Sequence, residues 1–245
     1  ASSDGTARIW HLSGNLEAQY LVSLQGHQGD VNSASFSPDG TKIVTAGADG
    51  TARLWDISGK QLREIKAHSS NVYSVNFSFD GKKIVTSSAD KTARVWDLSG
   101  KLLVELKGHT DTVWSAVFNH NGKQIVTASD DKTALVWDIT GKKVAELKRH
   151  SEAIYSATFS SDGKQIITGS LDQTALIQDT SGKIIAALVG HRGSISSARF
   201  SNDGKLIVTA SVDGVARVWN TSKKLRTEVQ INQRAFDVDS GVSAD

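Results

Sequence analysis

Short runs of alternating apolar and polar residues recur along the whole chain and predict β-strands. Within residues 68–107, residues 72–77 alternate with a period of two, and residues 83–87 form a β-branched run typical of a buried strand. Residues 92–97 and 102–106 give two further strands of similar length. No segment has helical periodicity. The pattern therefore predicts an all-β protein built from short strands.

Turn residues separate the predicted strands. Asp80-Gly81 lies between the first two strands of this stretch, and glycine accepts the positive φ that a tight hairpin turn requires. Equivalent first turns are Asp39-Gly40, Asn121-Gly122, Asp162-Gly163 and Asp203-Gly204. Outer turns are Ser58-Gly59, Ser99-Gly100, Thr140-Gly141 and Ser181-Gly182. Because hairpin turns join antiparallel neighbours, each stretch of about 41 residues predicts one four-stranded antiparallel sheet.

The whole pattern repeats with a step of 41 residues. The histidines that keep this step are His27, His68, His109, His150 and His191. The aspartates are Asp49, Asp90, Asp131, Asp172 and Asp213, and the tryptophans are Trp55, Trp96, Trp137 and Trp219, with Gln178 in the remaining repeat. A fixed period of this length indicates a repeat architecture. One sheet leaves too much apolar surface exposed, so the sheets must stack, and radial stacking gives a propeller.

Two dipeptides in these repeats resemble a known family. Gly-His occurs at 26–27, 108–109 and 190–191, and Trp-Asp occurs at 55–56, 96–97 and 137–138. From residue 1 to about 228 the chain is similar to the WD40-repeat (beta-transducin-like) family, in the highly regular style of its bacterial members. The resemblance implies a β-propeller with four strands per blade, usually with seven blades, that serves as a scaffold for binding other proteins.

The register predicts five complete blades and an incomplete sixth in a single domain over residues 1–245. Residues 1–27 would supply the third and fourth strands of a split blade, residues 28–228 the five complete repeats, and residues 229–245 a degenerate closing segment. An inner strand would begin at residues 236–238, but no residues match the second strand at 205–209. Either the last blade is irregular or the chain is a fragment of a longer array. The fragment is the slightly favoured alternative. Unpaired strand edges would allow the chain to self-associate by pairing with another molecule.

Each repeat also carries a histidine, a threonine and an aspartate, which are the groups of a nucleophilic triad. The threonines are Thr45, Thr86, Thr127, Thr168 and Thr209. The set recurs five times, whereas an enzyme needs one site, so we predict no catalytic residues. In the WD40 family the equivalent residues, with the tryptophan, form a structural hydrogen-bond network. Gln178 interrupts that network in one repeat, and Ala67 and Arg149 replace the glycine before the histidine.

Composition and charge exclude other kinds of ligand. The chain has 28 basic and 26 acidic residues with no long run of either sign, which disfavours nucleic acid. No apolar stretch approaches the ~18 residues needed to cross a membrane. With no cysteines and one histidine per blade, a zinc site is not expected, and the Asp-Gly turns lack the spacing of a calcium loop. We expect no metal, no cofactor and a cytoplasmic location.

Positions that change between repeats are the candidates for partner binding. The residue after the first apolar residue of each inner strand reads Asn32, Tyr73, Trp114, Tyr155 and Ser196. The residue before the turn aspartate includes Asp130 and Leu171. In WD40 propellers these positions lie on the rim of one face. Exposed aromatic residues clustered there are typical of a protein-binding hot spot. The alternative is that the rings fill the mouth of the central channel and touch only each other.

These observations predict a non-enzymatic scaffold that binds a protein or peptide through Tyr73, Trp114, Tyr155, Asp130, Leu171 and Asn32. The alternative function is a sensor or regulatory region excised from a larger multidomain signalling protein, such as the WD40 arrays of bacterial signalling ATPases. Partner identity, pathway and oligomeric state are not encoded in any motif of the chain.

Overall fold

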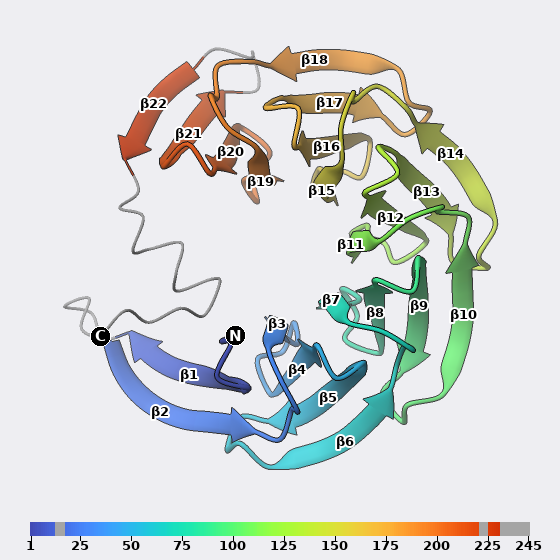
Figure 1. The fold of residues 1–245 in the computed structure, drawn as a ribbon, viewed down its shortest axis with the longest axis vertical. Coiled ribbons are helices and arrows are strands. Elements are labelled where there is room, and N and C mark those ends of the chain that lie inside the picture. The colour runs from blue at the N-terminus through green and yellow to red at the C-terminus, as the bar shows by residue number, and fades with distance from the viewer. Residues whose placement is uncertain (13–17, 221–224, 231–245) are drawn as a thin grey trace.

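The strands of the computed structural model lie around a central axis. It describes residues 1–12, 18–220 and 225–230, which form five four-stranded antiparallel sheets and one two-stranded sheet. In each four-stranded sheet the strands follow one another in sequence order from the axis outward (Figure 1). Each sheet is one blade, and consecutive blades are neighbours around the axis. This is the propeller with an incomplete sixth blade that the repeats predict.

Each blade has an inner, a second, a third and an outer strand. The inner strands are β3 (Val31–Phe36), β7 (Val72–Phe77), β11 (Val113–Phe118), β15 (Ile154–Phe159) and β19 (Ile195–Phe200). The second strands are β4 (Lys42–Gly47), β8 (Lys83–Ser88), β12 (Gln124–Ser129), β16 (Gln165–Ser170) and β20 (Leu206–Ser211). The third strands are β5 (Thr51–Asp56), β9 (Thr92–Asp97), β13 (Ala134–Asp138), β17 (Ala175–Asp179) and β21 (Val215–Asn220). The outer strands are β6 (Gln61–Lys66), β10 (Leu102–Lys107), β14 (Lys143–Leu147), β18 (Ile184–Leu188) and β22 (Leu225–Gln230).

The two-stranded sheet occupies the position of the split sixth blade. Its strands are β1 (Thr6–Leu12) and β2 (Ala18–Gln25), and both lie within residues 1–27, which the register predicts to supply the third and fourth strands. Ala7, Ile9 and Leu24 of this sheet pack with Val31 and Trp55 of the first complete blade. The predicted inner strand at 236–238 lies outside the described residues.

The hydrophobic core lies between blades and has no single centre. Val85 and Val95 of one blade, for example, pack with Val113 and Ala116 of the next. The same second-strand position is fully buried in four blades, at Val44, Val85, Val126 and Ile167. In the last complete blade the equivalent Val208 is 43% exposed. Each blade is therefore stabilised mainly by its neighbours, as in other repeat proteins.

The two ends of each inner strand define two faces of the propeller. The histidines that recur every 41 residues lie in the connections that precede the inner strands. We name the face that these connections form the histidine face. The Asp-Gly and Asn-Gly turns follow the inner strands, and we name the opposite face the turn face. An inner strand of six residues rises ~20 Å, so a ligand on one face does not reach the other.

Candidate functional site

A β-bulge begins the inner strand of every complete blade. In the β7–β8 ladder Val72 pairs with Ser88 and Ser74 pairs with Ser87, which leaves Tyr73 as the extra residue. The same register shift leaves out Asn32, Trp114, Tyr155 and Ser196 in the other blades. A bulge turns its side chain out of the regular alternation and is common beside functional sites. All five variable positions thus lie at the same kind of β-bulge, at the histidine face.

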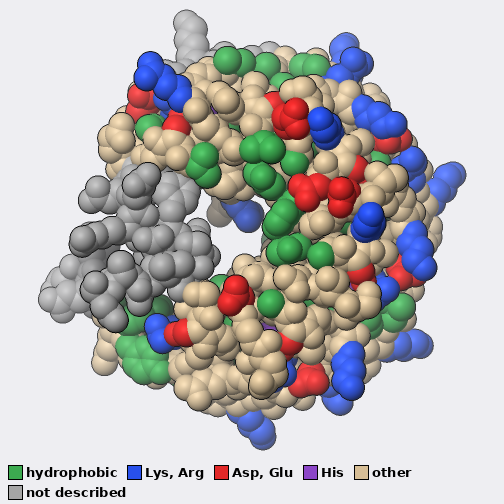
Figure 2. All heavy atoms as spheres, in the orientation of Figure 1, with side chains coloured by type: hydrophobic (Ala, Val, Ile, Leu, Met, Phe, Trp, Pro, Cys, Tyr) green, Lys and Arg blue, Asp and Glu red, His purple; other side chains and the backbone are tan. Residues whose placement is uncertain are grey.

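Three bulge residues form a contiguous aromatic cluster, which we name the aromatic patch: Tyr73, Trp114 and Tyr155. The Tyr73 and Trp114 ring centroids are 4.3 Å apart with planes tilted by 37°, and Trp114 meets Tyr155 edge-on at 5.5 Å. All three side chains are half-buried. Figure 2 shows hydrophobic side chains beside the central opening, next to β7, β11 and β15. The rings touch one another, as the packing alternative expects, and they also keep accessible surface.

The other predicted partner-binding residues have separate surroundings. Asp130 accepts a 2.7 Å hydrogen bond from the Trp114 indole N–H, so its carboxylate fixes the orientation of the central ring. Leu171 is 40% exposed. The Asn32 amide donates a 2.9 Å hydrogen bond to the Val72 carbonyl, which ties two blades together. The structure therefore joins Asp130 to the aromatic patch and gives Asn32 a contact within the fold.

Strained backbone accompanies the aromatic patch in the same three blades. In the turn after the second strand, Lys91, Lys132 and Gln173 have φ of 69°, 68° and 70°, where the other two complete blades have glycine. A non-glycine residue in this region costs ~1–3 kcal/mol. The Lys91 ammonium donates to the Thr110 carbonyl, and the Lys132 ammonium pairs with Glu152 at 3.1 Å. Side chains at strained positions thus brace the loops around the patch.

A chain of hydrogen bonds links the repeated polar residues inside each blade. In the β11–β14 blade the Trp137 indole N–H donates to the Thr127 hydroxyl at 2.9 Å, and the Thr127 hydroxyl lies 2.7 Å from His109 Nε2. His109 Nδ1 lies 2.8 Å from the Asp131 carboxylate. A neutral imidazole protonated on Nδ1 satisfies every partner, because Nε2 then accepts from the threonine.

The same series of hydrogen bonds recurs in the other four complete blades. Histidine contacts aspartate and threonine in the sets His27, Asp49, Thr45; His68, Asp90, Thr86; His150, Asp172, Thr168; and His191, Asp213, Thr209. Trp55, Trp96 and Trp219 donate to their threonines, whereas Gln178 donates to the Gly182 carbonyl at 3.3 Å. Among the described residues no buried side-chain nitrogen or oxygen lacks a hydrogen-bond partner. The network is therefore fully satisfied.

The surroundings of the network favour a neutral imidazole beside an ionised carboxylate, as the pKa shifts of both groups indicate. Burial lowers the pKa of His27, His68 and His150 and outweighs the neighbouring carboxylates. Burial alone would raise the pKa of Asp49, but donors from Gln28, Thr51 and His27 together lower it to about 2. Near neutral pH both groups are in the states that their hydrogen bonds require.

The network offers no open nucleophile. Thr127 has no exposed surface, and its oxygen already bonds the indole and the imidazole. In the part of the chain that the structure describes, no three histidine, aspartate or glutamate side chains come close enough to hold a metal ion. These hydrogen bonds connect the loop before the inner strand to the second and third strands. Their geometry is that of a network that holds the strands of one blade together.

Comparison with protein families assigns the repeats. The family described as WD domain, G-beta repeat matches residues 18–56, 59–97, 100–138, 141–179 and 182–220. The chain belongs to the WD40 family. Each WD40 match begins at the outer strand of one blade, or two residues before it, and ends in the third strand of the next. Domains of this family generally serve as scaffolds for protein interaction and are generally non-catalytic. The comparison with curated proteins gave no match. None of the described residues form a helix long and apolar enough to span a membrane.

The turn face of this WD40 propeller carries a cavity that the sequence reasoning missed. Its volume is about 620 Å³, and residues at the ends of all five inner strands line it, so it lies at the mouth of the central channel. The lining phenylalanines keep the 41-residue step: Phe36, Phe77, Phe118, Phe159 and Phe200. The residue two places after each one varies, as Pro38, Phe79, His120, Ser161 and Asn202. That variation was a signal available in the sequence.

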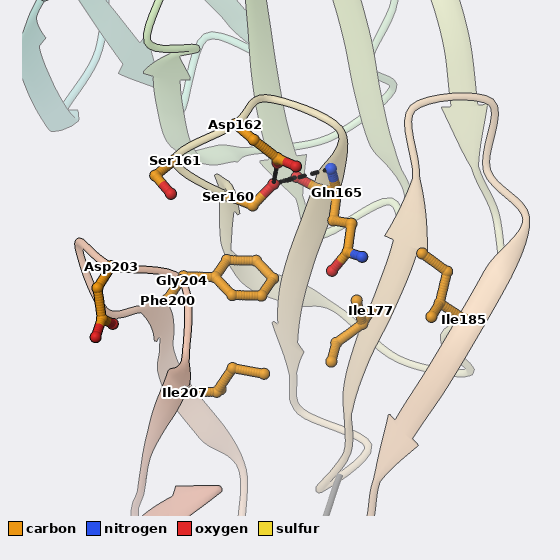
Figure 3. Close-up of a pocket in the computed structure, with 10 residues that line it drawn as sticks. All are labelled: Ser160, Ser161, Asp162, Gln165, Ile177, Ile185, Phe200, Asp203, Gly204 and Ile207. Atoms are coloured by element: carbon orange, nitrogen blue, oxygen red, sulfur yellow. Dashed lines mark hydrogen bonds between the residues drawn. The ribbon is translucent and has the colours of Figure 1, made fainter. Parts of the chain in front are cut away.

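A second cavity of about 300 Å³ adjoins the first between the last two complete blades. Figure 3 shows Phe200, Ile177 and Ile207 facing its interior. Ser160 caps the turn on its rim, because its hydroxyl donates to Asp162 at 2.6 Å and accepts from the Gln165 backbone N–H at 2.9 Å. Phe200 and Ser160 line both cavities, so the two are adjacent.

Proposed function

We propose that this chain is a non-catalytic scaffold that binds a protein or peptide on the histidine face. The contact surface is the aromatic patch with Asp130 and Leu171. The observation that carries the proposal is that bulges present three adjacent aromatic side chains at positions that vary between repeats. The bulge is common to all five complete blades, but only in these three adjacent blades does it carry an aromatic ring, and clustered aromatic rings are typical of a binding hot spot.

Two further observations support this proposal. The strained residues Lys91, Lys132 and Gln173 occur in the three blades that carry the patch, and strain of this kind clusters at functional sites. The Trp114–Asp130 hydrogen bond holds the central ring in one orientation, which lowers the entropy lost on binding. Nearly balanced charge, with 28 basic and 26 acidic residues, favours a protein partner over nucleic acid.

Affinity capture with a triple variant tests the proposal. The wild-type chain and the Tyr73→Ala, Trp114→Ala, Tyr155→Ala variant are used to recover partners from lysate of the source, with quantitative mass spectrometry. Ser196→Ala, a bulge residue without an aromatic ring, is the control. We expect the triple variant to fold and to lose its partner while the control keeps it.

Thermal denaturation of the same variants separates binding from packing. If the rings belonged to the core, each truncation would cost ~3–5 kcal/mol and the triple variant would not remain folded. Unchanged capture with unchanged stability would rule out both roles for the patch.

A further inference from the structure

The mouth of the channel on the turn face has the features of a second binding site. Its cavity of about 620 Å³ falls within the range of ligand-binding pockets. Repeated phenylalanines from neighbouring blades supply an apolar wall, and positions that differ from blade to blade supply the remaining lining. The aromatic patch lies at the other end of the inner strands, so the two sites are independent.

Among aspartate, glutamate, lysine and arginine, a single side chain lines this cavity, and it is basic. Arg199 lines it, and no aspartate or glutamate does. Arg199 is exposed and makes no ion pair with the described residues, unlike Arg53, Arg94 and Arg217, which pair with carboxylates. The position of Arg199 is uncharged in the other complete blades, as Ser35, Asn76, Val117 and Thr158. Basic side-chain atoms are visible inside the central opening in Figure 2. A guanidinium that has no ion-pair partner among the described residues, beside an apolar wall, is suited to a carboxylate.

Exposed rings lie on the same rim. Phe79 is 57% exposed and stacks on the His120 ring with centroids 3.7 Å apart, and Phe36 is also 57% exposed. The equivalent positions of Phe79 in other blades carry small or polar residues, so the fold does not require a ring there. The adjoining cavity lined by Phe200 and Ile207 extends the apolar surface away from the axis. Apolar side chains thus lie both at the channel mouth and in the adjacent cavity.

We propose that the turn-face cavity binds a peptide segment in which an aromatic residue stands next to an aspartate or glutamate. The carboxylate pairs with the Arg199 guanidinium, and the aromatic side chain packs against Phe79 and Phe36. A peptide with the ring alone loses the charge-assisted hydrogen bonds, and a peptide with the carboxylate alone loses the apolar contact. Both parts are needed for affinity.

Calorimetric titration with defined peptides tests the proposal. The probes are acetylated, amidated hexapeptides of glycine and serine with a central Phe-Asp, Phe-Asn or Ala-Asp pair, and a peptide ending in phenylalanine with a free carboxylate. We expect the Phe-Asp peptide to bind at least about tenfold more tightly than the Phe-Asn or Ala-Asp peptide. Arg199→Gln should remove the difference between Phe-Asp and Phe-Asn, and Phe79→Ser should weaken both.

Two further variants make the outcome decisive. Arg199→Glu should prefer a Phe-Lys peptide, because the charge of the site is reversed. Trp114→Ala, on the histidine face, should leave every affinity unchanged, so a failure of the function proposed above does not affect this result. Equal affinity for Phe-Asp and Phe-Asn on the wild type would overturn the proposal. So would a preference that survives Arg199→Gln, or tighter binding of the free C-terminal carboxylate than of the internal aspartate.

Discussion

Two neighbouring blades, β11–β14 and β15–β18, share a backbone design and differ at the buried tryptophan position. Trp137 is 2% exposed and donates to the Thr127 hydroxyl. Its counterpart Gln178 is 1% exposed and instead donates to the Gly182 carbonyl within its own hairpin. Histidine, threonine and aspartate keep the same contacts in both blades. The polar tie therefore forms without the indole, and the tryptophan adds a donor and a large apolar surface to it.

The same comparison explains a second difference. A Cβ on Gly108, the residue before His109, would lie 2.9 Å from the far edge of the Trp137 ring, so a side chain there would displace the ring in this blade. In the β15–β18 blade the shorter Gln178 occupies the tryptophan position, and Arg149 stands where the glycine would be. These two positions, 29 residues apart in sequence, meet in space, and the β7–β10 blade, which keeps Trp96, has no residue larger than Ala67 there.

Truncation of the buried aromatic residue should have the largest effect. We expect Trp137→Ala to lower the free energy of unfolding by ~3–5 kcal/mol, because it leaves a cavity between two blades. Gln178→Ala should cost much less, since the glutamine buries less apolar surface. Urea denaturation of both variants measures the difference, and similar losses would show that the indole adds nothing to its blade.

Removal of the carboxylate should have a smaller effect that also differs between the blades. Asp131→Ala strands buried donors and should cost ~1–3 kcal/mol. We expect Asp172→Ala to cost less, because its network already lacks the aromatic member and is less cooperative. Equilibrium denaturation is the measurement, with Asp130→Ala as a control outside the network. Equal losses for Asp131 and Asp172 would contradict the link between tryptophan and network.

A double-mutant cycle should show the coupling between Arg149 and Gln178. Gln178→Trp alone should not stabilise the blade, because the larger ring meets the long side chain of Arg149 where the β11–β14 blade has Gly108. Combined with Arg149→Gly it should gain stability, with a coupling energy of about 1 kcal/mol. Thermal denaturation of both single variants and the double variant gives this energy. Additive effects would mean that the two substitutions are unrelated.

Acid titration should reveal the smallest effect, carried by the histidines. The folded-state pKa of His150 is lowered by burial, so its contribution to stability is complete above its usual pKa of ~6.5 and is lost as the pH falls through the folded value. Asp172 has a lowered pKa too, and its contribution is lost in a lower window, below ~4. His150→Gln should flatten the stability profile just below pH ~6.5 and keep the lower step. An unchanged profile in the upper window would show that His150 does not titrate there.

Local sequence patterns predicted the strands because their causes are local. The alternation at 72–77 and 92–97 matches β7 and β9 residue for residue, and the β-branched run at 83–87 ends one residue short of β8. The bulge at Tyr73 could not be predicted, because a bulge depends on how two strands pair. The stacking of Phe79 on His120 likewise joins two blades, and only the assembled ring brings them together.

The candidate surfaces were predictable in part, for the same reason. Variation between repeats pointed to Trp114 and Tyr155 without revealing that the rings touch. The same test, applied to the end of the inner strand and the turn after it, would have pointed to Arg199 and Phe79. The absence of an ion pair at Arg199 could be known only from its surroundings in the folded chain.

The sameness of the interfaces between blades has a consequence for how the ring is assembled. Val44, Val85, Val126 and Ile167 fill equivalent positions at successive interfaces, so these contacts distinguish poorly between one neighbour and another. Order around the ring is instead imposed by connectivity. Short connections hold consecutive blades at effective concentrations in the millimolar range, far above those of free domains in solution. The covalent chain supplies the specificity that the apolar surfaces lack, and an added 41-residue unit would meet neighbours that already fit it.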